Sequence, residues 1–335
     1  MQPAIYGMAG EALTADERAF FRDAGPAGYI LFARNVASRE QVRALTDSLR
    51  ALHGRDDVPI LIDQEGGRVA RMKPPVWPPF PPGDVFARLY AVSPVAAIEA
   101  ARANAQAIAV TLREVGINVD CLPLLDVRKE GASDIIGDRA LGSEPMQVAA
   151  LGRAVLEGLR AGGVVGVVKH MPGHGRALVD SHKELPVVTA SEAELESDIE
   201  PFRTLNWAPM GMTAHVVYTA WDRSRCASLS PTVIGEIIRG RIGFDGLLMS
   251  DDLGMHALTG DFGNRASGAL AAGCDLALHC SGEMAEMQAI AHELESMGEA
   301  SRLRLHRAME TVAQAQEGAD YAALAARRDE LLAYA

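Results

Sequence analysis

Residues 163–170 have the sequence Gly-Val-Val-Gly-Val-Val-Lys-His, and this stretch says most about the fold. Its apolar, β-branched run does not alternate with polar residues. It therefore predicts a strand buried on both faces, as parallel strands are in α/β proteins. The run then ends in Lys169 and His170. Two polar residues at the end of such a strand indicate that the strand opens into a functional site.

Similar apolar runs recur along the chain. We predict seven more strands, at residues 4–7, 28–32, 59–63, 118–122, 211–215, 246–251 and 274–278. Eight strands in 335 residues leave roughly 40 residues for each strand and its helix, which suits a barrel with long loops. An open, doubly wound sheet is the alternative, but no Gly-x-Gly-x-x-Gly motif follows the first strands. We therefore predict one α/β domain over residues 1–335, a single (β/α)8 TIM-type barrel with a helical tail from about residue 301.

Helix signals lie between these strands. Ser38 and Gln41 form a capping-box pattern before a run of apolar residues at helical spacing. Ser93 and a following proline open a long alanine-rich helix that should stop at Gly116. Ser191, with a glutamate three residues later, opens another helix. The alternation of strand and helix supports parallel strand pairing.

The composition excludes several classes of function. The chain has 44 acidic and 32 basic residues and a formal net charge of −12, which argues against a nucleic-acid partner. No apolar stretch approaches the ~20 residues of a membrane span, and the start of the chain has no secretory pattern, so we expect no membrane association. The four cysteines are scattered, without a Cys-x-x-Cys pair. We therefore expect no disulfides, no cysteine-rich zinc site and a cytoplasmic location.

Polar residues stand at the ends of four predicted strands: Asp63, Lys169 with His170, His215, and Asp251 with Asp252. In a barrel of parallel strands, all of these ends meet on one face, where active sites lie. Four unrelated solubilising ends are the alternative. A cation at the end of a continuous apolar run favours the functional interpretation, because it needs a charged partner.

The first of these ends continues as Asp-Gln-Glu-Gly-Gly-Arg-Val-Ala-Arg over residues 63–71. The paired glycines allow a sharp turn of the backbone. Asp63 and Arg71 can then hold neighbouring hydroxyl groups of a sugar by paired hydrogen bonds. A loop held only by an Asp–Arg salt bridge is the structural alternative.

A flexible Gly-His-Gly segment follows His170 and leads to Asp180 and His182. These two residues are two positions apart, so both can point the same way in extended chain. A carboxylate beside an imidazole fixes its tautomer and raises its basicity, which suits proton transfer. The alternative is that His182 is an ordinary surface histidine. We expect residues 172–181 to be one of the less stable parts of the fold and to close over bound ligand.

The adjacent carboxylates of Asp251 and Asp252 should point to opposite sides of their strand. One would face the barrel centre and suit displacement at the anomeric carbon of a sugar, and the other would brace the wall. Two alternatives remain open. Both carboxylates could only cap the next turn, or His170, His174 and Asp63 could bind a catalytic metal. A proline and a glycine interrupt the His-x-x-x-His spacing, which disfavours the metal site.

Taken together, these motifs resemble the family 3 glycoside hydrolases, and specifically the single-domain β-N-acetylglucosaminidases that recycle fragments of the bacterial cell wall. The matching segments occur in the expected order and span most of the chain: GYILFARN (28–35), DQEGGRVAR (63–71), IGDRALG (136–142), KHMPGHGRALVDSH (169–182), MTAH (212–215) and SDDLGM (250–255). The Lys-His-x-Pro-Gly-His-Gly segment with its trailing Asp-Ser-His is the most specific of them. Two positions depart from the family. Met171 stands where Phe is frequent, and Arg176-Ala177 replaces a frequent Asp-Thr.

The resemblance implies a catalytic role for three residues: Asp251 as the nucleophile, and His182 as the acid/base with Asp180 as its partner. It also implies that the terminal N-acetylglucosamine is held by Asp63, Arg71, Arg139, Lys169 and His170. On this reading the enzyme is a retaining β-N-acetylhexosaminidase that needs no metal or organic cofactor. Its partners are small N-acetylglucosamine-containing muropeptides, and we expect a monomer. A metal-dependent barrel hydrolase and a non-catalytic muropeptide-binding protein are the alternatives.

Overall fold

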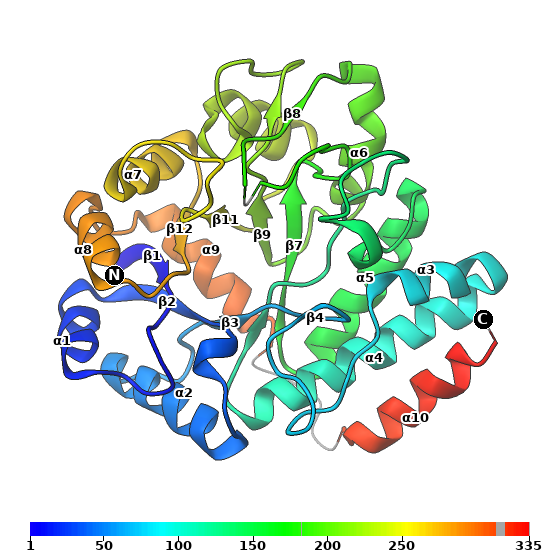
Figure 1. Ribbon diagram of the computed structural model, residues 1–335, viewed down its shortest axis with the longest axis horizontal. Helices are drawn as coiled ribbons and strands as arrows, with labels where there is room; N and C mark the ends of the chain where they lie inside the picture. The colour runs from blue at the N-terminus through cyan, green and yellow to red at the C-terminus, as the bar shows by residue number, and fades with distance from the viewer. Residues whose placement is uncertain (182, 313–318, 335) are drawn as a thin grey trace.

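The computed structural model describes residues 1–181, 183–312 and 319–334. Eight parallel strands close into a barrel in the order β1-β12-β11-β9-β7-β6-β3-β2. This is the predicted (β/α)8 TIM-type barrel (Figure 1). Its strands are β1 (Gln2–Tyr6), β2 (Pro26–Leu31), β3 (Ile60–Ile62), β6 (Val119–Asp120), β7 (Val165–Met171), β9 (Met210–Thr213), β11 (Leu247–Asp252) and β12 (Leu276–His279). All eight predicted strands are present, with ends shifted by one or two residues.

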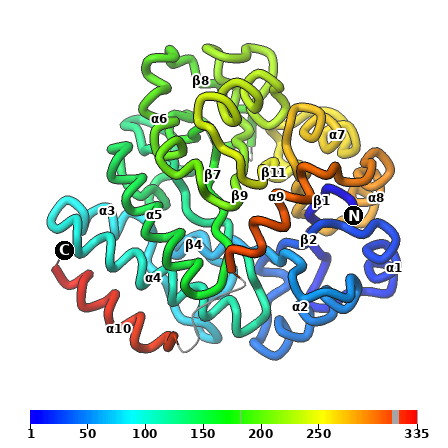
Figure 2. Tube along the Cα trace, turned by 180° about the vertical axis from the view of Figure 1, so that it is seen from behind, coloured from blue at the N-terminus to red at the C-terminus, as the bar shows by residue number. Residues whose placement is uncertain are grey.

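Helices surround the barrel (Figures 1 and 2). They are α1 (Ala15–Ala24), α2 (Arg39–His53), α3 (Gly83–Val92), α4 (Pro94–Glu114), α5 (Pro145–Ala161), α6 (Glu192–Thr204), α7 (Phe262–Ala272), α8 (Met284–Glu293), α9 (Glu299–Glu310), α10 (Tyr321–Leu332) and the π-helix η4 (Val233–Arg241). The short 3-10 turns are η1 (Ala33–Asn35), η2 (Gly137–Arg139) and η3 (Ala227–Leu229). In the described part of the chain, every helix is too short or too polar to cross a lipid bilayer.

The predicted serine caps are present, but the capping box expected at Ser38 forms only in part, because the Gln41 side chain accepts from the Ala37 amide and not from the Ser38 amide. The Ser38 side chain accepts a hydrogen bond from the Gln41 amide at the start of α2. Ser93 caps α4, whose chain then turns at Gly116 with a φ of 80°. A capping box at Ser191 starts α6. Because each cap satisfies amides that the first turn leaves without partners, the helix starts are set locally by the sequence.

Alternation along the strands divides the core into two layers. One set of side chains faces the outer helices, and the other fills the inside of the barrel. Leu305, Ala308 and Met309 of α9 pack against that inner set. In Figure 2 α9 crosses the opening at the amino-terminal ends of the strands. That end of the barrel is therefore closed, and the polar carboxyl ends of the strands open on the other side.

Two small two-stranded sheets lie on the carboxyl-terminal face of the barrel. β4 (Gln64–Gly66) and β5 (Val69–Ala70) form an antiparallel hairpin directly after β3. β8 (Val187–Val188) pairs with β10 (Val217–Tyr218) beyond the loop that follows β7. The hairpin places residues 63–71 over the barrel mouth, as the turn-forming glycines in that segment predict.

Candidate active site

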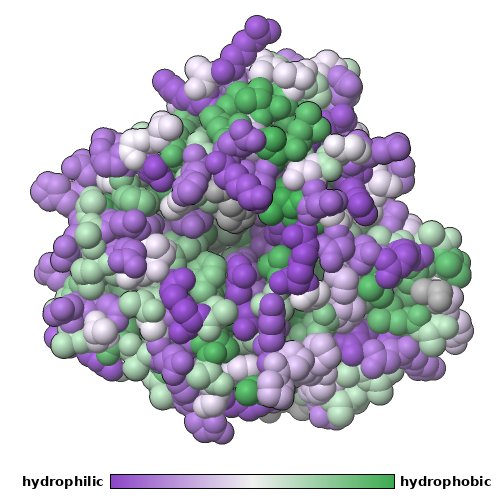
Figure 3. Space-filling model, in the orientation of Figure 1, coloured by the Kyte–Doolittle hydropathy of each residue, from purple (hydrophilic) through white to green (hydrophobic). Residues whose placement is uncertain are grey.

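A cavity of about 230 Å³ lies at the carboxyl-terminal ends of the barrel strands. In the surface view of Figure 3 this face is hollowed near its middle, and hydrophilic residues border the hollow. Of the residues predicted for the site, those that line the cavity are Asp63, Arg71, Arg139, Lys169, His170 and Asp251. Strand ends that are far apart in the sequence are thus brought to one place, as the barrel prediction requires.

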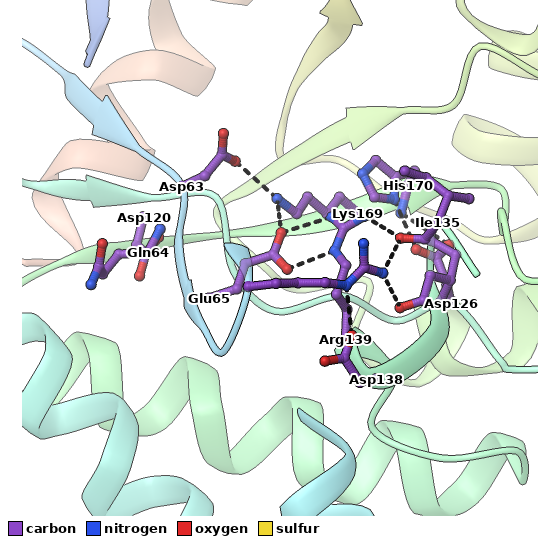
Figure 4. A network of polar contacts seen from close by, with 12 residues as sticks. Asp63, Gln64, Glu65, Asp120, Asp126, Ile135, Asp138, Arg139, Lys169 and His170 are labelled. Atoms are coloured by element: carbon purple, nitrogen blue, oxygen red, sulfur yellow. Dashed lines mark hydrogen bonds and ion pairs between the residues drawn. The ribbon is translucent and has the colours of Figure 1, made fainter. Parts of the chain in front are cut away.

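A buried network of charged side chains forms one wall of this cavity (Figure 4). The Lys169 ammonium lies 3.1 Å from Asp63 Oδ1 and 2.7 Å from Glu65 Oε1. Arg139 donates to both oxygens of Glu65, each at 2.8 Å, in a two-pronged pairing. The side chains of Lys169 and Glu65 are only 3% and 4% exposed. Such buried charges are tolerated because each one has an opposite charge and good hydrogen bonds.

The network keeps its members ionised. Burial alone would raise the pKa values of Asp63 and Glu65, but Lys169 and the neighbouring arginines outweigh it and hold both pKa values below their usual range. Burial would lower the pKa of Lys169, but the two carboxylates reverse this and raise it. The same balance raises the pKa of Arg139. At neutral pH the wall therefore presents fixed hydrogen-bond donors and acceptors to the cavity.

Arg71 joins the network from the β4–β5 side. Its Nη2 lies 2.8 Å from Asp63 Oδ2, and its guanidinium sits 5.0 Å from the ring centre of Phe32. Arg71 Nε is buried without a hydrogen-bond partner among the described residues. The pair predicted from the sequence is thus formed, but as part of a larger network and not as an isolated salt bridge.

His170 is held from behind by Asp126, a residue that the sequence analysis did not single out. His170 Nδ1 lies 2.8 Å from Asp126 Oδ2, while the amide of His174 donates to Asp126 Oδ1 at 2.7 Å. Asp126 is fully buried, and despite that burial the two nearby histidines lower its pKa to about 2. The peptide bond between Lys169 and His170 is cis, and both side chains line the cavity. Asp126 thus fixes the orientation of the His170 ring.

His174 also lines the cavity and is 3% exposed. Burial, reinforced by the charge of His170, lowers the pKa of His174 to about 4, so its imidazole is neutral at physiological pH. Its Nδ1 atom has no hydrogen-bond partner within the described ranges. A neutral imidazole suits contact with an uncharged ligand.

Asp251 and Asp252 at the end of β11 differ in their surroundings. Asp251 is 6% exposed and lines the cavity, and its Oδ1 accepts a hydrogen bond from the Asp252 amide. Asp252 Oδ1 accepts from the amides of Gly254 and Cys280, which ties β11 to the end of β12. His215 Nε2 contacts the Asp252 carbonyl oxygen at 2.9 Å, so His215 supports the backbone here. Asp252 also borders the cavity, but its carboxylate is engaged with backbone amides.

The loop after β7 is more buried in its first half than the sequence analysis predicted. Residues 172–175 and Ala177 are buried, and the first strongly exposed side chain is Leu178. Asp180 is partly exposed, and Ser181 lines the cavity. His182, predicted as the acid/base, lies outside the described residues. The expectation of a weakly anchored loop therefore does not suit its first half, where close packing leaves little freedom.

The structure does not support the predicted metal alternative: within residues 1–181, 183–312 and 319–334, no group of three His, Cys, Asp or Glu side chains is arranged to hold a metal ion. His170 and His174 face Asp126, whereas Asp63 is paired with Lys169 and Arg71.

The family of the chain is set by comparison with known proteins. The model of the glycosyl hydrolase family 3 N-terminal domain matches residues 6–315. The chain belongs to glycosyl hydrolase family 3. A β-hexosaminidase of Alkalilimnicola ehrlichii is 39% identical over 311 residues, which cover 91% of this chain and 88% of that protein. A β-hexosaminidase of Chromobacterium violaceum is 40% identical over 284 residues, or 83% of this chain and 78% of that one.

A solved structure is similar over nearly the whole chain. NagZ from Neisseria gonorrhoeae, in complex with N-trifluoroacetyl-D-glucosamine, superimposes with a TM-score of 0.86 at 30% identity, covering 99% of this chain and 98% of that one. The resemblance inferred from the motifs is therefore confirmed, and so is the prediction of a family 3 glycoside hydrolase of the β-hexosaminidase type.

Proposed function

We propose that this family 3 glycoside hydrolase is a retaining exo-β-N-acetylglucosaminidase that removes terminal N-acetylglucosamine from peptidoglycan fragments in the cytoplasm. The observation that carries the proposal is the cavity wall in which paired, ionised Lys169, Arg139 and Asp63 stand on the same face as Asp251. Such a wall offers a neutral sugar many fixed hydrogen bonds beside one candidate nucleophile. The cysteines are all free thiols, in keeping with a reducing compartment.

We assign the reacting groups as follows. Asp251 attacks the anomeric carbon, the bond from that carbon to the aglycone oxygen breaks, and a covalent glycosyl-enzyme forms. His182 gives its proton to the departing oxygen, and Asp180 orients and charges that imidazole. In the second step the neutral His182 takes a proton from water, and the water oxygen displaces Asp251. Two displacements at one carbon retain its configuration.

The other residues bind and orient the glycon. Asp63, Arg71, Arg139, Lys169 and His170 are our candidates for the ring of hydrogen bonds around the sugar, with Glu65 and Asp126 behind them. The similar NagZ structure holds an N-acylated glucosamine, which supports an N-acetylated glycon here. A site built to pair the acetamido group should lose much of its efficiency when that group is missing, because buried polar atoms then have no partner.

Release of p-nitrophenol from its β-N-acetylglucosaminide, with and without a chelator, tests the proposal. We expect turnover that survives the chelator and falls steeply on the matching β-glucoside. Comparable rates on both glycosides would refute the substrate assignment. Loss of activity with the chelator would favour the metal-dependent alternative, and binding of a muropeptide without turnover would favour the non-catalytic one.

Mapping the modified peptide after reaction with a fluorinated slow substrate tests the nucleophile. We expect the label on Asp251. A label on Asp252, or on neither carboxylate, would refute the assignment.

A further inference from the structure

The loop from β7 towards Asp180 consists of two physically different halves. Residues 172–175 and Ala177 are buried, whereas Leu178 is 70% exposed and Lys183, Glu184 and Leu185 are also exposed. The first exposed side chain of the loop is therefore at position 178. Val179 and Asp180 are partly exposed, and Ser181 is buried again.

Two neighbouring segments hold the first half in place: the loop after β6 and the connection after β9, which contains β10. The Tyr218 hydroxyl donates to the Gly173 carbonyl at 2.8 Å, and the Ser133 amide donates to the Ala177 carbonyl at 2.9 Å. Gly175 packs so closely on Val127 that a Cβ atom there would lie 1.9 Å from the Val127 carbonyl oxygen. Residues 172–177 are thus fixed to the loops after β6 and β9.

Arg176 adds the connection to helix α6. Its Nε lies 2.5 Å from Asp198 Oδ2, and its Nη2 donates to the Glu194 carbonyl at 2.9 Å. Lys129 supports the same carboxylate from the other side, 3.4 Å from Asp198 Oδ1. The Asp198 side chain is 2% exposed and that of Arg176 is 22% exposed. This pair is therefore shielded from solvent, unlike the surface ion pairs that contribute little.

The identity of residue 176 decides whether this connection can form. This chain has arginine at position 176, and the guanidinium forms the pair with Asp198. An aspartate at position 176 would meet the buried Asp198 carboxylate with a like charge and could not form the pair.

We propose that Arg176 is a positioning residue: its pairing with Asp198 fixes the base of the loop from which Asp180 and His182 reach the glycosidic oxygen. The proposal rests on the proposed function, in which His182 is the general acid. Asp180 is only four positions after Arg176, a span of at most about 14 Å of extended chain. A shift at the base is therefore passed on to the acid/base pair, and a misplacement of about 1 Å can cost about a hundredfold in rate.

The test compares substrates that differ only in their need for the acid. For the β-N-acetylglucosaminides of methanol and of 2,4-dinitrophenol, kcat/KM reports the step in which the leaving oxygen departs. We expect Arg176→Ala to lower kcat/KM by about 10- to 100-fold for the methyl glycoside and by less than about threefold for the dinitrophenyl glycoside. Asp198→Asn should show the same split, and Arg176→Lys should recover part of the loss because it keeps the charge.

Glu200→Gln is the matched control. Glu200 is on the same helix and pairs with Arg203 at the surface, 37% exposed, so its loss should leave both substrates unaffected. Thermal melting of every variant shows whether it is folded at the assay temperature. Should Arg176→Ala prove too unstable, the isosteric Asp198→Asn carries the test.

An equal fractional loss on both substrates, or no loss on either, in Arg176→Ala and Asp198→Asn would overturn the proposal. His182→Ala separates this result from a failure of the proposed function. If His182→Ala shows the substrate-dependent loss and the anchor variants do not, the anchor role alone is wrong. If His182→Ala shows no such loss, or the wild-type enzyme hydrolyses neither glycoside, the proposed function is wrong and the anchor role falls with it.

Discussion

Replacing Glu65 by glutamine would test how much of the site depends on its buried charges. The side chain of Glu65 is 4% exposed, forms an ion pair with Lys169 at 2.7 Å and accepts two hydrogen bonds from Arg139 at 2.8 Å. Glutamine keeps the shape but removes the charge, and its amide nitrogen would face a cation. Lys169 would then have only Asp63 as a counter-charge, and Arg139 would lose its two-pronged partner.

The expected loss of stability follows from the burial of this network. Removing one partner of a buried ion pair destabilises a protein by about 3–5 kcal/mol. Unfolding entropy of about 2.1 cal/mol/K per residue amounts to about 0.7 kcal/mol/K for 335 residues. Glu65→Gln should therefore lower Tm by about 4–7 °C. It should also raise KM for the N-acetylglucosaminide, because Lys169 and Arg139 would no longer be held against the sugar.

Scanning calorimetry and initial-rate kinetics measure the two effects. Asp138→Asn is the matched control, because Asp138 pairs with Arg68 near the same cavity but both side chains are more than 40% exposed. That pair should contribute about 0–1 kcal/mol, or a Tm shift of about 1 °C. A Glu65→Gln enzyme with the same Tm and KM as the control would refute the reasoning.

The pH dependence gives a second, independent reading of the same network. The folded-state pKa values of Asp63 and Glu65 are depressed, so their contribution is fully present above the unfolded values of about 4 and is lost as pH falls below them. The wild-type enzyme should therefore lose stability steeply below about pH 5. Glu65→Gln should lose less over the same range, and parallel curves for the two proteins would contradict this account.

Three further outcomes follow from the site. Asp251→Ala should nearly abolish turnover. Asp252→Ala should mainly lower Tm, because the Asp252 carboxylate accepts hydrogen bonds from backbone amides. Equal kcat values for the two variants would contradict the assignment of Asp251 as the nucleophile. Asp126→Asn should release the His170 ring and lower kcat/KM for the β-N-acetylglucosaminide by about tenfold or more. Unchanged kinetics would argue against this positioning role of Asp126. The pKa of His174 is lowered to about 4, so the unfolded chain binds the proton more readily than the folded one. His174 should therefore destabilise the fold as pH drops from about 6.5 towards 4. In His174→Gln, Tm measured by calorimetry should depend less on pH in that window, and an unchanged slope would refute this account.

The fold could be predicted because its signals are local. A continuous apolar run such as residues 163–170 marks a doubly buried strand, and a serine before a helix marks its start. The position of helix α9 across the end of the barrel could not be predicted in this way. Its side chains Leu305, Ala308 and Met309 fill the end of the barrel, but sequence pattern alone shows only that a helix forms.

The site could be predicted only where a residue belongs to a strand end or to a specific motif. Glu65 stands within the quoted segment 63–71, yet nothing in the sequence shows that it faces Lys169, more than 100 positions away. Asp126 follows a strand that ends six residues earlier, and its bond to His170 joins the loop after β6 to the end of β7. Both residues are carboxylates that support other side chains, and such roles depend on tertiary packing. The predicted site contained three cations, Arg71, Arg139 and Lys169, but only Asp63 to pair with them in this wall. Counting these charges could have indicated that a further carboxylate was needed to balance them.

That count also bears on the kind of ligand the site can take. Lys169, Arg139 and Arg71 are three cations in one wall, and in a site for an anion the ligand itself would neutralise them. Here the protein supplies Asp63 and Glu65 instead, so most of the positive charge is balanced before any ligand binds. An uncharged sugar could not compensate free buried cations, whereas its hydroxyl groups can accept hydrogen bonds from cations that are already paired and donate to the carboxylates beside them. The paired wall therefore supports a neutral glycon, and it explains why loss of Glu65 should affect stability and sugar binding together.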